Sequence, residues 1–199
     1  DALRLDPYPQ LARLRAEAPI SFFPQLEGIV FTRRDDIDIW EKRIDIFSSE
    51  QPGGLMTRLM GQNMMRHDGD AHQSQRRAMQ PAVSPRAVQR HWRNAFREAA
   101  VRVLDELAPK GRADLCTDYA MTLSGEALRL ITGLDNVTAH EMDAHSQAMI
   151  DGISNYAGDA DIEARGLGAV AALDAAIEAR LDDFAASPPD PDSIDGVSV

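Results

Sequence analysis

The sequence has little cysteine and no long hydrophobic run. Cys116 is the only cysteine, so no disulfide can form within the chain, and a reducing, cytoplasmic location is the simplest interpretation. A membrane-spanning helix needs about 20 consecutive apolar residues. No such run is present, so we expect no membrane partner. A basic segment followed by an apolar one, which marks a secretory signal, is also missing.

The sequence patterns of several enzyme classes are missing as well. No glycine-rich turn follows a predicted strand, as dinucleotide- and phosphate-binding loops require. His140 and His145 share a predicted helix, but a spacing of five does not bring both imidazoles onto one face to bind zinc. Cys116 follows a turn, where a lone thiol more often acts as a small buried apolar residue than as a nucleophile.

Acidic residues are unevenly distributed. The chain carries 32 acidic and 21 basic residues, a net charge of −11, which argues against a general nucleic-acid binder because such proteins need a basic surface. Residues 71–97 nevertheless contain no acid. The arginines of this stretch are Arg76, Arg77, Arg86, Arg90, Arg93 and Arg97. A basic stretch in an acidic protein indicates a face that meets a negative partner, and a solvated helix face is the alternative.

Hydrophobic spacing predicts a mainly α-helical protein with a small β-sheet near the N-terminus. Two apolar runs, at 20–23 and 28–32, predict a β-hairpin. Thr138 and Glu141 form a T-x-x-E capping box at the start of a later helix. The predicted helices cover about 7–14, 36–44, 70–79 (capped by Asp70 and ended by Pro81), 84–109, 119–134, 138–155 and 162–184. The apolar stripe of the 84–109 helix comprises Val88, Trp92, Phe96, Val103 and Leu107.

Two segments lack this periodicity. Residues 51–66 contain three glycines, one proline and four methionines, which predicts a mobile loop with at most one helical turn. Loops of that length in compact domains are usually functional or disordered. The proline-rich segment 187–192 breaks the last helix and is predicted to link it to another one that starts near residue 193. We therefore expect the chain to be truncated.

His72 and Arg76 form the most informative pair. They lie four residues apart on the predicted 70–79 helix, so both side chains leave the same face. An imidazole N–H and a guanidinium that point the same way can clamp a carboxylate or a phosphate. Taken alone, the H-x-x-x-R pattern has little specificity, and a surface pair without a ligand is the alternative.

The order of segments around this pair resembles the cytochrome P450 family. Bacterial members commonly read D-P-P-E-H-T-R-L-R-R before a helix that starts with F-T-P-R, and this chain has residues 68–77 followed by Ser84-Pro85-Arg86. Gly69 and Ala71 depart from the family pattern but leave the spacing of the clamp intact. Other similar segments are Asp6-Pro7-Tyr8, Gly111-Arg112-Ala113-Asp114-Leu115 and Ile131-Thr132-Gly133-Leu134.

The resemblance implies a cytochrome P450 fold that stops before the oxygen-activating helix and the cysteine loop. Residues 1–199 would form the N-terminal part of a single haem-binding monooxygenase domain. In that family the histidine and arginine of H-x-x-x-R hydrogen-bond the haem propionates, which assigns haem b (iron protoporphyrin IX) to His72 and Arg76, with Met65 at the haem edge. The axial cysteine would lie beyond Val199, so Cys116 is not this ligand, and no catalytic residue is expected within the chain.

The resemblance also implies where substrate and electrons arrive. The 51–66 loop and the 149–165 segment are similar to the stretches that close over a small organic substrate in the family. The expected pocket residues are Leu55, Met56, Met149 and Ile153. A ferredoxin- or flavodoxin-type donor, or a fused reductase, would dock on Arg77, Arg90 and Arg93. The expected full-length reaction inserts one oxygen atom of O₂ into the substrate, and this half would not be competent alone.

Two other functions stay open. One is a helical binding or regulatory module whose arginine-rich face holds an acidic partner. The other, more remote, is a metal hydrolase.

Overall fold

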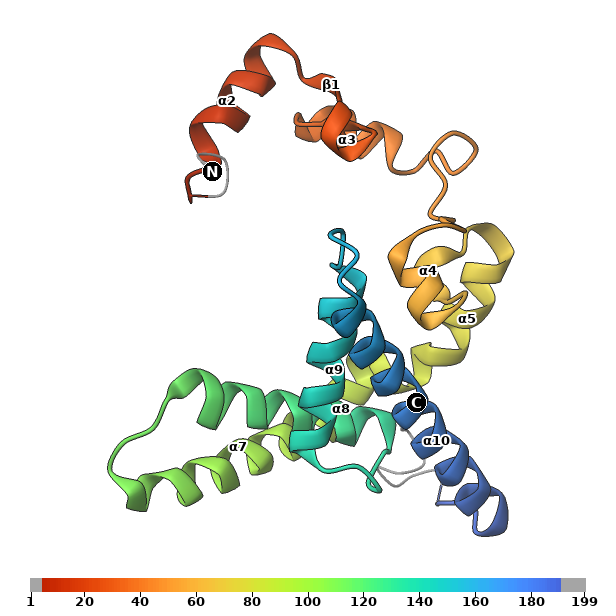
Figure 1. The fold of residues 1–199 in the computed structure, drawn as a ribbon. Coiled ribbons are helices and arrows are strands. Elements are labelled where there is room, and N and C mark those ends of the chain that lie inside the picture. The colour runs from red at the N-terminus through yellow and green to blue at the C-terminus, as the bar shows by residue number, and fades with distance from the viewer. Residues whose placement is uncertain (1–4, 191–199) are drawn as a thin grey trace. The chain divides into compact units, whose positions relative to one another are not determined.

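The structure is a computed structural model that describes residues 5–190 (Figure 1). The chain divides into two compact units, one within residues 1–50 and the other from residue 51 onward, and each is described by itself. Most of the described residues are helical and two strands form a small sheet, so the predicted fold class is confirmed. Among the described helices, none is long and apolar enough to cross a membrane.

The first unit consists of short helices around a β-hairpin. Its elements are α2 (Tyr8–Glu17), β1 (Ile20–Phe23), η1 (Pro24–Leu26), β2 (Gly28–Phe31) and α3 (Arg34–Trp40). The strands pair antiparallel, with Ile20 opposite Phe31 and Phe23 opposite Gly28. Glu27 closes the connection with a left-handed φ of 47°. The predicted hairpin is therefore confirmed, with a 3₁₀ turn between its strands.

Aromatic side chains hold the first unit together. The Phe47 ring packs edge-on against Phe31 at 5.5 Å and tilted against Trp40 at 6.0 Å between ring centroids. None of the described residues in this unit is fully buried. Phe22 and Ile29 are more than half exposed, at 62% and 61%. The hairpin therefore relies on its backbone hydrogen bonds and on this aromatic cluster more than on a buried core.

Over its described residues, the second unit has helices as its regular elements, joined by turns and loops. Its elements are α4 (Leu55–Met60), η2 (Met64–Arg66), α5 (Gly69–Val83), α6 (Pro85–Ala87), η3 (Val88–Trp92), α7 (Arg93–Leu107), η4 (Ala108–Lys110), η5 (Leu115–Met121), α8 (Thr122–Thr132), α9 (Ala139–Ile153) and α10 (Ala160–Ala186). The predicted end of a helix at Pro81 was wrong, because α5 continues to Val83. A proline removes one backbone donor, and so close to the helix end that loss does not break the last turn. Residues 187–190 are not helical, whereas 191–192 and the helix expected near 193 lie outside the described residues.

The apolar stripe of the predicted 84–109 helix is mostly buried, as predicted. Trp92 is 1% exposed and its indole N–H donates to the carbonyl oxygen of Ala82 at 2.6 Å, which ties η3 to the end of α5. Val103 and Leu107 are buried too, but Val88 is 46% exposed. Val88 begins a π-helical segment, in which hydrogen bonds run from residue i to i+5. The regular spacing of the stripe therefore fails at Val88.

Helices α8, α9 and α10 pack around a core of Leu134, Val137 and Met142. The predicted capping box is present: the Thr138 amide donates to the Glu141 carboxylate at 2.9 Å and the Glu141 amide donates to the Thr138 hydroxyl at 3.2 Å. The Thr138 hydroxyl also donates to the Glu141 carboxylate at 2.7 Å, and this hydrogen bond, together with that from the Thr138 amide, holds the pKa of Glu141 below its usual value. Gly125 of α8 is buried so close to the backbone of Ala139 that a side chain would not fit.

Gly125→Ala should destabilise the protein by roughly 1–3 kcal/mol, because the added Cβ would meet the Ala139 carbonyl oxygen and push α8 away from α9. Gly168→Ala is the matched control, since a Cβ at that position of α10 meets nothing within 4 Å. The control should be neutral or stabilise by up to ~1 kcal/mol, because alanine favours helix. Urea unfolding of both variants measures the difference. Equal effects would contradict the close approach of α8 and α9.

Candidate functional site

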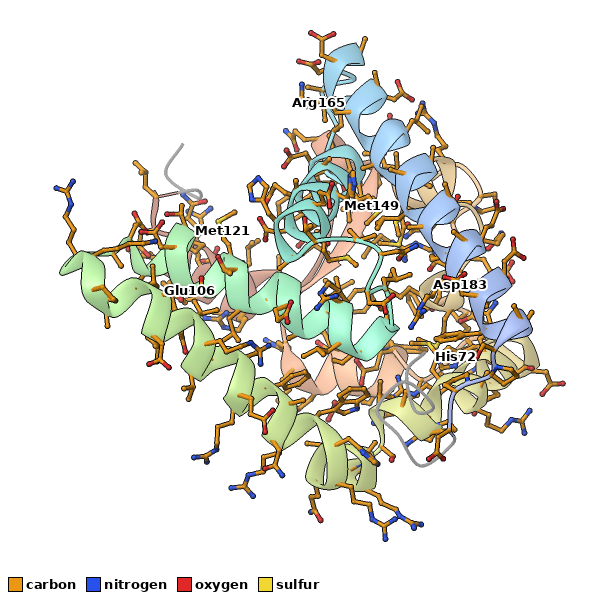
Figure 2. The ribbon with its side chains drawn as sticks, turned by 90° about the horizontal axis from the view of Figure 1, so that it is seen from below. His72, Glu106, Met121, Met149, Arg165 and Asp183 are labelled. Atoms are coloured by element: carbon orange, nitrogen blue, oxygen red, sulfur yellow. The ribbon has the colours of Figure 1, made fainter. Side chains whose placement is uncertain are left out.

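The first candidate site lies on α5, where His72 and Arg76 are one turn apart. The helix begins at Gly69, so the predicted cap at Asp70 was wrong: Asp68 is the N-cap residue and Asp70 sits in the first turn. An acidic side chain in the first turn still stabilises the helix, because it lies near the positive end of the helix dipole. His72 is half-buried and Arg76 is exposed. Figure 2 labels His72 on this helix.

The donors of this pair are unused. The side chains of His72 and Arg76 form no hydrogen bond or ion pair with any residue that the structure describes. The segment before α5 adds a further donor, because η2 packs against α5 and the Nε atom of Arg66 is buried without a partner among the described residues. Leaving a buried donor unpaired costs about 1–3 kcal/mol, more for a charged group. This region therefore fits a ligand that brings carboxylate oxygens.

Met65, the third residue predicted to bind the cofactor, lies in η2 and its side chain is 55% exposed. The Asn63 carboxamide caps this short helix by accepting a hydrogen bond from the Met65 amide at 3.0 Å. The cap fixes the backbone of Met65 and leaves its apolar side chain available to a flat ligand. A contact with haem stays a prediction.

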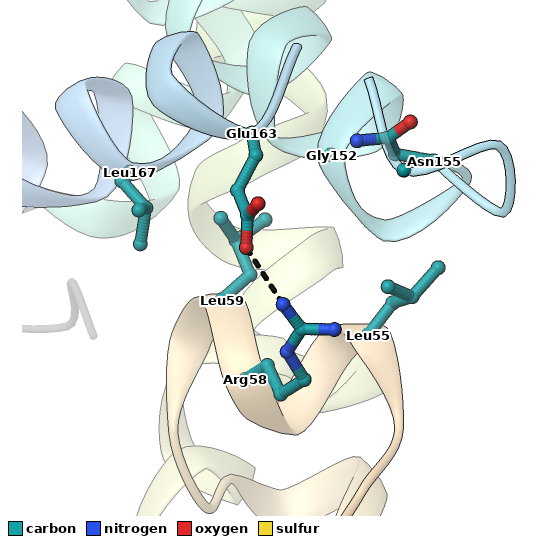
Figure 3. Close-up of a pocket in the computed structure, with 8 residues that line it drawn as sticks. Leu55, Arg58, Leu59, Gly152, Asn155, Glu163 and Leu167 are labelled. Carbon is teal, nitrogen blue, oxygen red and sulfur yellow. Dashed lines mark hydrogen bonds and ion pairs between the residues drawn. The ribbon is translucent and has the colours of Figure 1, made fainter. Parts of the chain in front are cut away.

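The second candidate site is formed where α4 meets α9 and α10 (Figure 3). Leu59 is 8% exposed and its two methyl groups lie against Gly152 and Gly166. A Cβ on Gly152 would come within 2.8 Å of one Leu59 methyl, and a Cβ on Gly166 within 3.1 Å of the other. The two glycines therefore form a notch, which we call the glycine notch, and Leu59 fills it.

An ion pair crosses the same junction. The Arg58 guanidinium of α4 donates to the Glu163 carboxylate of α10 at 2.7 Å, and both side chains are about half exposed (Figure 3). Beside the pair lies a small cavity of about 50 Å³. Its lining residues are Leu55, Arg58, Leu59, Gly152, Asn155, Gly158, Glu163 and Leu167. The two segments that were expected to border a substrate, 51–66 and 149–165, are therefore in contact.

The predicted pocket residues are only partly brought together. Leu55 lines the cavity, whereas Met56, Met149 and Ile153 are half-buried elsewhere on α4 and α9 (Met149 is labelled in Figure 2). Sequence reasoning missed the residues that form the junction. A glycine late in α9 and another early in α10 were the available signal, because paired small residues let helices approach closely. No local pattern links Arg58 to a residue 105 positions later.

The turn from α9 to α10 is closed by one buried side chain. Asn155 is 8% exposed. Its side-chain Nδ2 donates to the Asp159 carbonyl oxygen at 2.7 Å, and its side-chain Oδ1 accepts from the Asp159 backbone amide at 2.9 Å. The Asp159 carboxylate in turn caps α10 by accepting from the amides of Asp161 and Ile162. Both ends of the turn are therefore fixed by hydrogen bonds.

The arginines predicted to meet an electron donor are on the outside of the second unit. Arg77 of α5, Arg90 of η3 and Arg93 of α7 are all exposed, and none of them pairs with an acid among the described residues. Their charge is therefore available to a partner.

Cys116 and the histidines do not form a site. The expectation that Cys116 is buried was wrong, because it is exposed in the first turn of η5, where its amide donates to the capping carboxylate of Asp114 at 2.8 Å. A hydrogen bond from the Thr117 amide, together with that from the Cys116 amide, lowers the pKa of Asp114. Within residues 5–190 there is no cluster of three or more side chains that could hold a metal ion.

Comparisons with known proteins agree on one family. No family model matches the chain. It is 28% identical over 144 residues to the C-19 steroid 1alpha-hydroxylase of Sorangium cellulosum. The aligned region covers 71% of this chain and 36% of that protein. The structure of cytochrome P450 260B1 from Sorangium cellulosum matches 94% of this chain with 25% identity and a TM-score of 0.73. P450BioI, solved with an acyl carrier protein ligated to hexadec-9Z-enoic acid, matches 98% with a TM-score of 0.81 and 17% identity.

The chain spans about half the length of the two solved relatives, 46% and 52%, and 36% of the curated one. The fold of the described residues is therefore that of part of a cytochrome P450. What these relatives bind or oxidise is a property of those proteins.

Leu59→Ala should release α4 from the glycine notch, since Leu59 is the buried side chain of this helix. Truncating a buried leucine costs about 2–5 kcal/mol, and here the loss falls on the docking of α4 rather than on the whole unit. Limited proteolysis should therefore cut within 51–66 faster in this variant. Met60→Ala, at a 37% exposed position of the same helix, is the control. If both variants are cut at the same rate, the notch does not hold α4.

Proposed function

We propose that this chain, whose fold is that of part of a cytochrome P450, forms part of a haem-dependent monooxygenase that activates O₂ and oxidises a small organic substrate. The observation that carries the proposal is the pair of unused donors on α5, His72 and Arg76, one helical turn apart. The matched relatives are longer than this chain, so the activity is proposed for the full-length protein.

The residues present fit haem b, whose two propionates are carboxylates. We propose that the His72 imidazole and the Arg76 guanidinium each donate to a propionate, because charge-assisted hydrogen bonds are the stronger ones. No acidic residue between 71 and 97 competes for the guanidinium. The buried, unpaired Nε of Arg66 adds positive charge beside the same helix. Met65 would lie against the edge of the ring.

Bound haem iron with a thiolate ligand supplies the oxygen chemistry. The residues of this chain would bind and orient the group, and would exclude water from the substrate side. We assign no iron ligand among the described residues. Cys116, the one cysteine of the chain, lies in the exposed first turn of η5, which is a different helix from α5 and far from it in the sequence.

We further propose that α4, α9 and α10 border the substrate pocket, with Leu55, Met56, Met149 and Ile153 as apolar contacts. Such side chains favour a substrate with a large apolar surface. A C-19 steroid is a reasonable first compound to test, because the curated relative is named for that substrate.

Electrons would arrive at the exposed arginines. We propose that Arg77, Arg90 and Arg93 attract an acidic ferredoxin, a flavodoxin or a fused reductase domain, because complementary charge steers encounter and raises the association rate. The net charge of −11 makes this basic region the exception on an acidic protein.

The double variant His72→Ala, Arg76→Ala of the full-length protein should lose haem faster. Each charge-assisted hydrogen bond contributes about 1.5–3 kcal/mol, so the double loss should weaken haem retention by on the order of 100-fold or more. Transfer of haem to an acceptor protein measures the rate, and absorbance gives the occupancy of the purified protein.

Gln73→Ala, Arg77→Ala is the matched control, because these residues have the same spacing one position further along α5. It should retain haem as the wild type does. Equal haem loss from both double variants would remove the assignment of the propionates. Wild-type full-length protein that takes up no haem at all would instead favour a helical module that binds an acidic partner through its arginines.

Reversing charge at Arg77, Arg90 and Arg93 should slow reduction of the protein by its donor, because all three are exposed and unpaired among the described residues. The defect should be largest at low salt and shrink as salt rises, since exposed charges are screened over about 10 Å at 0.1 M. Stopped-flow reduction at several salt concentrations tests this. Arg165→Glu, an exposed position on α10, is the control. Unchanged rates and salt dependence in the triple variant would leave these arginines as a solvated face.

A further inference from the structure

We infer that the Asp68–Gly69 bond, at the start of α5, is a site of spontaneous modification at which aspartate converts to isoaspartate through a cyclic imide, and that this conversion shifts the start of the helix that carries His72. The modification itself is independent of the proposed function. Its consequence rests on that function, since His72 is the residue assigned to a haem propionate.

The reaction needs only the two residues and water. The Gly69 backbone nitrogen attacks the Cγ atom of Asp68 in its protonated form. An N–Cγ bond forms, the Cγ–OH bond breaks, and water leaves, made of that hydroxyl and the amide proton. Water then adds to the former main-chain carbonyl of the imide and breaks its bond to nitrogen. The chain now runs through Cγ, the α-carboxyl is free, and no oxidant or reductant has taken part.

The backbone of Gly69 leaves its nitrogen open to this attack. Asp68 is extended, with φ −114° and ψ 171°, and Gly69 has a φ of 54°, which glycine adopts without steric cost. A Cβ at Gly69 would meet nothing within 4 Å, so no neighbour has to move. Among the described residues no acceptor binds the Gly69 amide, as is usual for the first amides of a helix. Gly69 is also exposed, so water reaches the bond.

Glycine at this position is what permits the reaction. The similar family segment, D-P-P-E-H, has a proline here, and proline lacks the backbone N–H that imide formation consumes. Gly69 leaves the spacing of the clamp intact but places a reactive bond four residues before His72.

The modification would act on His72 through the backbone. The His72 amide donates to the Asp68 carbonyl oxygen at 3.4 Å, a long hydrogen bond at the start of α5. In isoaspartate this oxygen belongs to a free carboxylate, and an additional carbon atom separates Asp68 from Gly69 along the chain. The first turn of α5 must then rearrange, and His72 lies in that turn.

A second Asp–Gly bond, Asp151–Gly152 of α9, should be protected. The Asp151 carboxylate accepts from the Gln147 side-chain amide at 2.8 Å. Gly152 is buried near the end of the same helix, so turning its peptide unit would break helical hydrogen bonds. A third such bond, Asp195–Gly196, lies outside the described residues. Asp151–Gly152 therefore serves as an internal control.

Ageing the full-length, haem-loaded protein at neutral pH and physiological temperature tests the inference. Chromatography of proteolytic peptides separates isoaspartate from aspartate, and an isoaspartyl methyltransferase labels it. We expect isoaspartate in the peptide that contains 68–69 and none in the peptide that contains 151–152. Asp68→Ser, which keeps a capping residue, should abolish it. Asp68→Asn should form it faster, because a neutral amide is attacked more easily than an ionised carboxylate.

Haem retention is the second readout. The modified fraction of aged wild-type protein should lose haem to an acceptor protein about ten-fold faster than fresh protein, as expected when one charge-assisted hydrogen bond is lost. Aged and fresh Asp68→Ser should lose haem at the same rate.

Absence of isoaspartate at position 68, or equal amounts at 68 and 151, would overturn the modification site. Isoaspartate at 68 with unchanged haem loss would overturn its effect on His72. Protein that accumulates isoaspartate at 68 but takes up no haem would support the modification site and overturn the proposed function.

Discussion

The close crossing of α9 and α10 at Gly152 and Gly166 is the contact on which the second site depends. Because neither residue has a side chain, the helices leave a notch, and Leu59 fills it from α4. Asn155 then fixes the turn that follows α9. A short segment with almost no helical stability of its own is thereby positioned beside two long helices. Any side chain at either glycine would have to displace Leu59, which would alter the entrance to the proposed pocket.

A different constraint governs α5. The stretch 71–97 contains no acidic residue, so none of its arginines can form an ion pair within the stretch. His72 and Arg76 keep their donors unused among the described residues, and the Arg66 Nε is buried without a partner. The buried Arg66 donor costs free energy while it is unpaired, and a carboxylate would satisfy it. The same lack of acid leaves the exposed Arg77, Arg90 and Arg93 without an ion pair among the described residues.

Short-range patterns were the part of the structure that could be predicted from the sequence. The Thr138–Glu141 capping box, the hairpin of residues 20–31 and the helix carrying His72 and Arg76 each depend on residues a few positions apart. Predictions failed where contacts between distant residues, or an altered helix geometry, determine which side chains are buried. Val88 is exposed because a π-helical segment shifts its face, and Cys116 is exposed because Asp114 starts η5 at the surface. The docking of α4 depends on Leu59 meeting Gly152 and Gly166, which lie far away in the sequence, so no local pattern predicts it.

The central claim is that α5 holds the carboxylates of a haem group. A crystal structure of the full-length, haem-loaded protein tests it most directly. We expect propionate oxygens within hydrogen-bond distance of a His72 ring nitrogen and of the Arg76 guanidinium, with Met65 against the ring edge. A structure in which His72 and Arg76 face solvent, while other residues bind both propionates, would contradict it.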